Sequence, residues 1–249
     1  MTLIHKRPAR AGRSMAASFV TTAILDVDGV LLSSPHEQAW REALAGFSDP
    51  ARFTPEVYEA EVAGKPRLDG ALAALLVLGV PDARGRAETY AIRKQARLEA
   101  LIRAGRVSAY PDALRFAETL KARGLRMAAA SSSRNATAMM RSVCLDGGGT
   151  LLDLFDIDVS GREVAHGKPA PDIFLLAASA LHAKPGDCFV VEDSPAGIMA
   201  ARSAGMQALG VARRGEATLL LEAGAALVVS DLDEIDLAAL FAGQLRRAA

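Results

Sequence analysis

The chain contains 249 residues with a formal net charge of zero, and 51% of them are hydrophobic. This length allows one large domain or a core with a smaller second domain, and the neutral balance argues against a nucleic-acid binder that works by bulk charge. No apolar run approaches the roughly 20 residues of a membrane span. The two cysteines lack metal-ligand spacing, so we expect free thiols in a reducing cytoplasm.

Residues 1–18 carry basic side chains and no acidic one. A transit peptide has this composition, and so does a disordered tail, with or without an alternative start at Met15. The stretch lacks the apolar region of a secretion signal. We interpret it as a disordered tail and expect a cytoplasmic protein.

The first predicted strand covers residues 19–25, an apolar run rich in β-branched side chains. It ends on Asp26, Val27, Asp28 and Gly29. In an open parallel sheet, ligands bind beyond the carboxyl ends of the strands, which would place both carboxylates at a binding edge. Such a pair can divide the work between a nucleophile or metal ligand and a proton carrier. Asp and Gly are also common in plain turns.

Residues 34–106 follow a helical pattern after a short linker at residues 30–35. Helices are expected from His36 to about Gly46, from Pro55 onward, and over a long segment from Asp82 to Arg103. Glycines separate these segments, and no strand pattern appears among them. A helical block placed between the first strand and the rest of the chain indicates an inserted cap domain.

Strand and helix patterns alternate again from Tyr110 to a final helix that ends near Arg246. This alternation predicts a parallel sheet with right-handed crossovers. The expected architecture is therefore a Rossmann-like α/β core at residues 19–33 and 107–249, with a small all-helical cap at residues 34–106. The glycines at residues 147–149 precede no Lys-Ser/Thr pair, so we interpret them as a flexible insert rather than a phosphate-binding loop.

Four polar clusters fall at predicted strand ends. In chain order they are Asp26 with Asp28, Ser131, Lys168, and Glu192 with Asp193. Each cluster alone fits a turn, a helix N-cap or a solvated loop charge. Together they provide a carboxylate nucleophile, a hydroxyl and an ammonium for a phosphoryl group, and acids for Mg²⁺. Phosphoryl transfer requires this combination, because its catalysis is mainly positioning and charge neutralisation.

The order and context of these clusters resemble the four motifs of the haloacid dehalogenase-like hydrolase superfamily. The stretches at residues 167–174 (GKPAPDIF) and 190–198 (VVEDSPAGI) are similar to its β-phosphoglucomutase-like subgroup. The resemblance implies that Asp26 is the nucleophile and Asp28 the general acid and base. It implies that Ser131 and Lys168 bind the transferring phosphoryl group. The implied Mg²⁺ ligands are Asp26, the backbone carbonyl of Asp28, Glu192 and Asp193.

Finer resemblances to the β-phosphoglucomutases concern the substrate. They imply a substrate-binding set of His36, Trp40, Arg67, Lys94, Ser132, Ser133, Arg134 and Asn135. Arg67 and residues 133–135 fall where those enzymes hold the second, non-transferring phosphate. The segment between Asp28 and His36 is shorter than in the mutases, and Ala63 stands where they carry a lysine. His36 remains either a plain helix-start residue or an acid–base group at the hinge of the cap.

From these observations we expect an enzyme: a Mg²⁺-dependent haloacid dehalogenase-like phosphatase that forms an aspartyl phosphate and acts on a small sugar phosphate or related phosphometabolite. The alternative is a β-phosphoglucomutase that interconverts β-glucose 1-phosphate and glucose 6-phosphate. A more distant alternative is a catalytically silent binding protein. The expected partner is a small phosphorylated metabolite, without nucleic acid or membrane, and we expect a monomer or a weak dimer.

Overall fold

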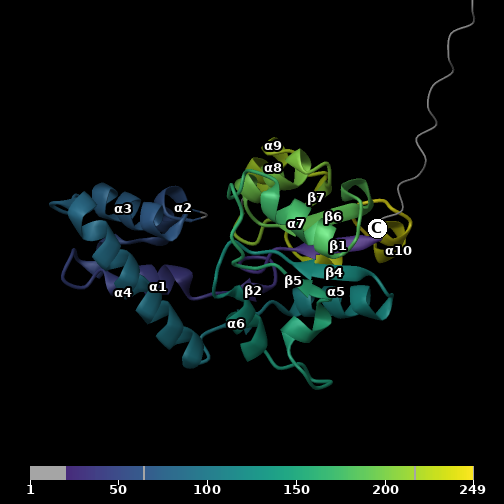
Figure 1. Ribbon diagram of the computed structural model, residues 1–249, viewed down its shortest axis with the longest axis horizontal. Coiled ribbons are helices and arrows are strands. Elements are labelled where there is room, and N and C mark those ends of the chain that lie inside the picture. Colours follow the sequence, from purple (N-terminus) through teal and green to yellow (C-terminus); the bar gives the residue numbers. More distant parts are fainter. Residues whose placement is uncertain (1–20, 64, 216, 249) are drawn as a thin grey trace, which may run out of the picture.

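The centre of the protein is a six-stranded, wholly parallel sheet in the order β5-β4-β1-β6-β7-β8 (Figure 1). The computed structural model describes residues 21–63, 65–215 and 217–248, so the interpretation of residues 1–18 lies outside the described residues. The strands are β1 (Thr22–Leu25), β4 (Arg126–Ala129), β5 (Ile157–Asp158), β6 (Cys188–Glu192), β7 (Gln207–Val211) and β8 (Leu227–Val229). The Rossmann-like architecture expected from the alternating pattern is confirmed.

The strand β1 lies in the middle of the sheet, between β4 and β6. Its side chains alternate between the two faces, because successive residues of a strand point in opposite directions. Ala23 and Leu25 pack into the core on one face and Ile24 into the core on the other, and all three are fully buried. A strand that is buried on both faces reads as a continuous apolar run, which explains the pattern that identified it.

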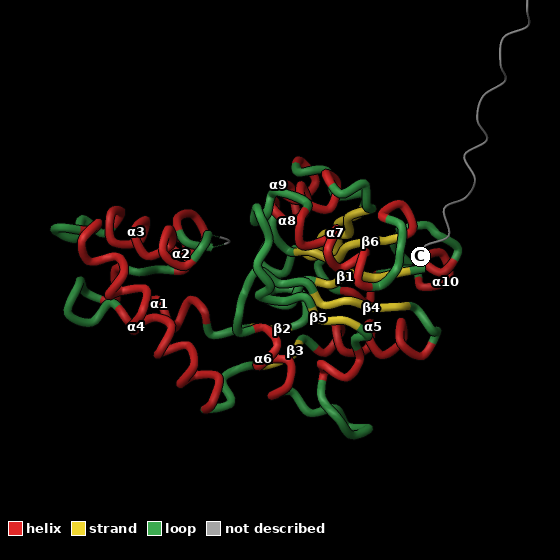
Figure 2. Tube along the Cα trace, viewed as in Figure 1, coloured by secondary structure: helices red, strands yellow, loops and turns green. Residues whose placement is uncertain are grey.

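Helices cover both faces of the sheet (Figures 1 and 2). One layer contains α5 (Pro111–Ala122), α6 (Ala136–Ser142) and α10 (Leu237–Phe241). The other contains α7 (Asp172–Ala180), α8 (Pro195–Ser203) and α9 (Ala217–Glu222). Short 3-10 helices lie in the connections at Leu151–Leu154, Pro185–Asp187 and Leu232–Glu234. With both faces covered, the carboxyl ends of the strands form the edge at which polar side chains collect.

The cap consists of four helices beside the core, at the left of Figure 2. They are α1 (His36–Ala43), α2 (Pro55–Glu61), α3 (Arg67–Val77) and α4 (Ala83–Arg103), with a 3-10 turn at Pro50–Arg52. The cap has a hydrophobic core of its own around Trp40 and Tyr90, whose ring centroids are 5.2 Å apart. The buried Tyr90 hydroxyl donates to the Trp40 carbonyl oxygen at 2.8 Å, which ties α4 to α1.

Two short strands join the cap to the core. β2 (Leu32–Ser33) precedes the cap and β3 (Ser108–Ala109) follows it, and they pair antiparallel with Ser33 opposite Ser108. The sequence pattern predicts only a linker at residues 30–35, and it misses this ribbon because two-residue strands are too short for alternation to be visible. The chain therefore enters and leaves the cap at adjacent positions.

The last helix is shorter than the sequence pattern predicts. α10 ends at Phe241, whereas the prediction extends it to about Arg246. Gly243 has a φ of +83°, a left-handed conformation that ends helices. The chain beyond it turns back, and Arg247 forms an antiparallel bridge with Ile235. Among the residues that the structure describes, no helix is long and apolar enough to span a bilayer.

Candidate active site

The carboxyl ends of β1, β4 and β6 bring three of the polar clusters to one edge of the sheet. Asp26 directly follows β1, Ser131 lies just beyond β4, and Glu192 is the last residue of β6. The Asp26 backbone N–H donates to the Val191 carbonyl at 3.0 Å, so the sheet register fixes its position. The side chains of Asp26, Ser131 and Glu192 are buried. This edge is therefore a protected polar site on a rigid scaffold.

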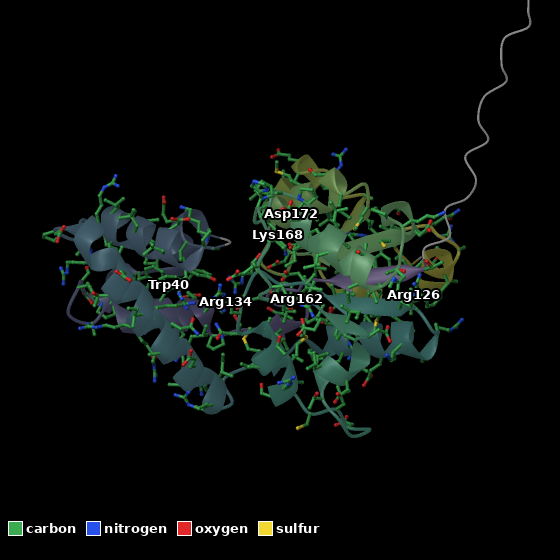
Figure 3. All side chains as sticks on the ribbon, viewed as in Figure 1. Trp40, Arg126, Arg134, Arg162, Lys168 and Asp172 are labelled. Atoms are coloured by element: carbon green, nitrogen blue, oxygen red, sulfur yellow. The ribbon has the colours of Figure 1, made fainter. Side chains whose placement is uncertain are left out.

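Lys168 lies between two of these carboxylates. Its Nζ donates to Asp26 Oδ1 at 2.6 Å and also to Glu192 Oε1. The Lys168 side chain is only 10% exposed, so its charge is balanced by two acids rather than by water. Figure 3 shows Lys168 on the side of the core that faces the cap. The lysine cluster and the two carboxylate clusters thus meet at one point.

Glu192 is held by the turn that follows β6. Its Oε2 accepts hydrogen bonds from the Ser194 backbone N–H at 2.8 Å and from the Ser194 hydroxyl at 2.9 Å. Ser194 Oγ in turn accepts from the Gly197 N–H at 3.1 Å and caps α8. A β-carbon at Gly197 would lie 1.9 Å from Glu192 Cδ. Glycine is therefore the residue that leaves room for this carboxylate.

Asp193 lies against the loop that follows β1. A β-carbon at Gly29 would lie 1.8 Å from Asp193 Oδ2, and Gly29 has a φ of +84°, which favours glycine. Carboxylate oxygens of Asp26, Glu192 and Asp193 lie within 4.8 Å of one another. Hard oxygen donors in such a group suit Mg²⁺. The donor set at this edge therefore fits a magnesium ion.

These carboxylates strongly affect one another. Burial, reinforced by the charge of Glu192, raises the pKa of Asp26 to about 7 against the lowering effect of Lys168. Burial and the neighbouring carboxylates also raise the pKa of Asp193 well above its ordinary value. Burial would lower the pKa of Lys168, but Asp26 and Glu192 raise it. The site thus holds more negative charge than Lys168 balances, and a divalent cation would relieve this excess.

The loop after β4 is arranged around Ser131. The Ser131 N–H donates to Ser160 Oγ at 3.2 Å, and its own Oγ accepts from the Ser133 N–H at 3.2 Å. Ser133 Oγ accepts from the Asn135 N–H, also at 3.2 Å. Ser132 is exposed on this turn. The hydroxyls of Ser131 and Ser133 therefore stabilise the loop that follows β4.

The cap brings His36 close to the second aspartate of the first cluster. His36 begins α1, and its Nε2 lies 3.9 Å from Asp28 Oδ2. Its Nδ1 lies 3.0 Å from the Nζ of Lys94 on α4. That Nζ also lies 4.9 Å from the centroid of the Trp40 ring. Trp40 is only 4% exposed and belongs to the core of the cap, so its ring packs against Lys94 from within the cap.

The environment of His36 fixes its protonation state. Burial lowers the pKa of His36 to about 4, with Lys94 adding to the effect and Asp28 opposing it. Burial, with a contribution from Arg67, lowers the pKa of Lys94 to about 8. A neutral His36 that accepts a hydrogen bond from Lys94 at Nδ1 carries its proton on Nε2, on the side of Asp28. That Nε2 has no hydrogen-bond partner among the described residues.

A second set of cap residues faces the loop after β4. Arg67 Nη1 donates to Gln95 Oε1 at 2.8 Å, and Gln95 Nε2 donates to Asn135 Oδ1 at 2.9 Å. The first bond joins two helices of the cap, and the second links the cap to the core. Arg134 is exposed between the two domains (Figure 3) and pairs with Glu163 at 3.1 Å. Gln95 is not among the candidates from the sequence, although it directly follows Lys94.

Arg213 supports the site, and the sequence pattern did not identify it as a site residue. Its guanidinium donates to the carbonyl oxygens of Gly29 at 3.0 Å and Val30 at 2.9 Å, directly after Asp28. It also pairs with the buried Asp112 at 3.0 Å. Arg213 lies just beyond the carboxyl end of β7. The rule that sites collect at such strand ends could have identified it.

The chain is similar to known hydrolases and phosphomutases in sequence and in structure. A sequence model of haloacid dehalogenase-like hydrolases matches residues 20–205. The β-phosphoglucomutase of Bacillus subtilis is 42% identical over 118 residues, so the match covers 47% of this chain and 47% of that protein. The phosphorylated carbohydrates phosphatase of Thermotoga maritima is 29% identical, covering 83% of this chain and 92% of that protein. The crystal structure of an archaeal β-phosphoglucomutase from Pyrococcus has a TM-score of 0.72 and 31% identity, covering 90% of this chain and 99% of that one.

Proposed function

The chain belongs to the haloacid dehalogenase-like hydrolase family, and we propose that it is a Mg²⁺-dependent phosphatase acting on a small sugar phosphate or a related phosphometabolite. Family membership makes it an enzyme of the phosphatase and phosphomutase type. The observation that carries the proposal is Lys168 in contact with Asp26 and Glu192, at a point where three carboxylates converge. The name of the Thermotoga maritima relative supports a phosphorylated carbohydrate as the substrate class.

Asp26 is the nucleophile in this proposal. One of its carboxylate oxygens attacks the phosphorus atom and forms an acyl phosphate, while the bond from phosphorus to the sugar oxygen breaks. Asp28 gives a proton to the leaving sugar oxygen and then takes one from the water that hydrolyses the acyl phosphate. Lys168 and Ser131 bind the phosphoryl oxygens. The 2.6 Å contact of Lys168 with Asp26 supports these roles, because it orients the nucleophile and opposes the rise of its pKa that burial causes.

His36 and Lys94 assist the proton transfer at Asp28. The position of His36 Nε2, 3.9 Å from Asp28 Oδ2, supports this role. Because both groups belong to the cap, Asp28 has a proton-bearing neighbour only when the cap lies close to the core. Cap closure would then link substrate binding to acid catalysis.

Asp26, Glu192 and Asp193 would hold Mg²⁺, together with the backbone carbonyl of Asp28. The bound ion would neutralise charge on the phosphoryl oxygens as the bond to phosphorus changes. The clustering of the three carboxylates within 4.8 Å supports this assignment. The raised pKa values of Asp26 and Asp193 also support it, because burial and the neighbouring carboxylates disfavour their charged forms and a bound cation would oppose this effect.

The substrate lies between the cap and the core in this proposal. Arg67 from the cap and Arg134 with Asn135 from the core would bind an anionic group at the far end of the substrate. Guanidinium groups suit this task because their forked donors match phosphate oxygens two at a time. The contacts of Gln95 with Arg67 and Asn135 support it, since they connect Arg67 of the cap to Asn135 of the core.

The alternative is a β-phosphoglucomutase, which the contacts across the two domains favour. Gln95 bonds to Asn135 and His36 approaches Asp28, so the cap meets the core in two places. A mutase needs such closure, because water must be kept from the acyl phosphate while the sugar phosphate rebinds in the reverse orientation. A phosphatase needs only to admit water. The names of the Bacillus subtilis and Pyrococcus relatives point in the same direction.

The test is a screen of phosphorylated metabolites that includes β-glucose 1-phosphate, with free phosphate and glucose 6-phosphate both measured. Release of free phosphate as the main product would support the phosphatase, and glucose 6-phosphate would support the mutase. Absence of Mg²⁺-dependent turnover on every compound, including a generic phosphomonoester, would refute both and favour a silent binding protein.

The nucleophile has a separate test. Asp26→Asn should abolish turnover and leave the fold intact, because an amide does not form the acyl phosphate. A variant that kept more than about a hundredth of the wild-type rate would remove Asp26 from this role, since losing an acid–base group alone typically costs 10²–10⁴-fold. Circular dichroism on the same sample is the control for folding.

A further inference from the structure

A cavity of about 450 Å³ lies at the junction of the cap and the core, outside the catalytic edge. The two hinge strands contribute Ser33 and Ser108 to its wall. None of the carboxylates or the lysine of the candidate active site lines it. Glu37 and Arg41, four residues apart on α1, face the cavity, whereas His36 and Trp40 lie on another face of the same helix. The cavity is therefore separate from the substrate cleft.

The wall of this hinge cavity is rich in positive charge. Arg41, Arg106 and Arg214 line it, and Glu37 is the one acid among the described residues of its wall. Glu37 accepts from Arg41 at 3.0 Å, which fixes one guanidinium at the wall. The chain as a whole has no net charge, so three guanidinium groups around one hollow are a local excess. Such a group of forked donors matches the oxygens of a phosphate.

A helix end adds backbone donors to the same wall, beside a buried hydroxyl. The Ser34 Oγ is buried and has no hydrogen-bond partner among the described residues. Leaving a buried polar group without a partner is energetically costly. Pro35 occupies the N-cap of α1, and no side chain caps this helix. The free N–H groups of a helix N-terminus favour an anion. The helix end is independent of the arginines and favours the same type of ligand.

We propose that the hinge cavity is a second binding site, for a small metabolite that carries a phosphate group. Its volume exceeds what a bare phosphate needs and falls within the range of small-molecule sites, about 300–1,000 Å³. Arg41 belongs to the cap and Arg214 to the core, so one bound ligand contacts both domains. Occupancy would hold the hinge ribbon in one position and change the freedom of the cap. This site goes beyond the proposed catalytic function and does not depend on it.

The test measures binding by the full-length protein in the absence of divalent metal, in excess chelator at pH 8. Under these conditions the clustered carboxylates of the active site repel anions, and no turnover is expected. The probes are inorganic phosphate and glucose 6-phosphate, and isothermal titration calorimetry measures their binding. The variants are Arg41→Gln with Arg106→Gln, and Arg106→Glu alone, which changes an exposed side chain and should not affect folding. Arg134→Gln, on the substrate side, is the matched control.

The wild-type protein should bind both probes with one site per chain, and glucose 6-phosphate more tightly. The double variant should bind at least tenfold more weakly, Arg106→Glu should also lose binding, and Arg134→Gln should stay within twofold of the wild type. Absence of binding to the wild type would overturn the proposal. So would equal binding by the wild type and the arginine variants, or a loss confined to Arg134→Gln, which would assign the anion to the substrate cleft.

Discussion

The raised pKa of Asp26 predicts how the stability of the metal-free protein changes with pH. Asp26 has a pKa of about 7 in the folded protein against 3.8 as its ordinary value. The folded state therefore favours the protonated acid. The contribution of Asp26 to stability is fully present below pH 3.8 and is lost as the pH rises through 7. Asp26→Asn removes this titration while keeping a side chain of the same size.

The size of the effect follows from the shift. One pKa unit corresponds to about 1.4 kcal/mol, so a shift from 3.8 to about 7 amounts to roughly 4 kcal/mol at high pH. Between pH 5 and pH 8 the free energy of unfolding of Asp26→Asn should therefore rise by about 3 kcal/mol relative to the wild type. The lowered pKa of His36, about 4, works in the opposite direction. Its contribution is lost as the pH falls below its ordinary value of 6.5, but it acts on both proteins and cancels in the difference.

The assay is urea unfolding in excess chelator at pH 5, 6, 7 and 8, followed by far-ultraviolet circular dichroism. The single tryptophan, Trp40, lies in the cap, so its fluorescence would follow only part of the molecule. Asp69→Asn, at an exposed position of α3, is the matched control and should run parallel to the wild type. A constant difference between Asp26→Asn and the wild type across this range would refute the reasoning. With saturating Mg²⁺ the trend should shrink.

Three further predictions concern single residues of the site. Gly197→Ala should lower Mg²⁺ affinity and the turnover rate at least a hundredfold, because its β-carbon would lie 1.9 Å from Glu192 Cδ. Gly186→Ala, where a β-carbon meets open space, is the control and should keep wild-type kinetics. Equal kinetics for the two variants would contradict the steric argument. Arg213→Gln should lower the free energy of unfolding, measured with urea, by about 3–5 kcal/mol, because the buried carboxylate of Asp112 loses its cationic partner. A loss below about 1 kcal/mol would contradict this, since that is the size expected for a salt bridge at the surface. Arg67→Ala should lower kcat/KM by about 2–3 kcal/mol on a doubly anionic sugar phosphate and leave acetyl phosphate turnover nearly unchanged, and equal losses on both would refute the distal anion site.

The sequence was sufficient to predict that the polar side chains of the candidate site meet at one edge of the sheet. Asp26 and Glu192 lie at the ends of apolar runs. The geometry of a parallel sheet brings such strand ends together, whatever structure the intervening segment adopts. The helical cap was predictable for a similar reason, since a block of helical periodicity interrupts the α/β alternation. These features depend on local patterns and on one topological rule.

Other features depend on contacts between distant segments. The bond between Gln95 and Asn135 depends on how the cap sits against the core, and nothing local to either residue indicates it. Arg213 is separated in sequence by more than a hundred residues from Asp112, its buried partner. Trp40 fits a substrate-binding pattern, yet its ring is buried in the core of the cap because Tyr90 packs against it. Such contacts are set by tertiary packing, which periodicity does not encode.

The hinge ribbon also has a consequence for the modularity of the fold. Ser33 and Ser108 are paired across β2 and β3, so their Cα atoms lie about 5 Å apart. The segment between them could be replaced by a two-residue hairpin turn without moving either strand. All six strands of the main sheet and the residues Asp26, Ser131, Lys168 and Glu192 lie outside that segment. The cap is thus inserted between two serines that lie side by side in space, and no strand of the main sheet belongs to the inserted segment.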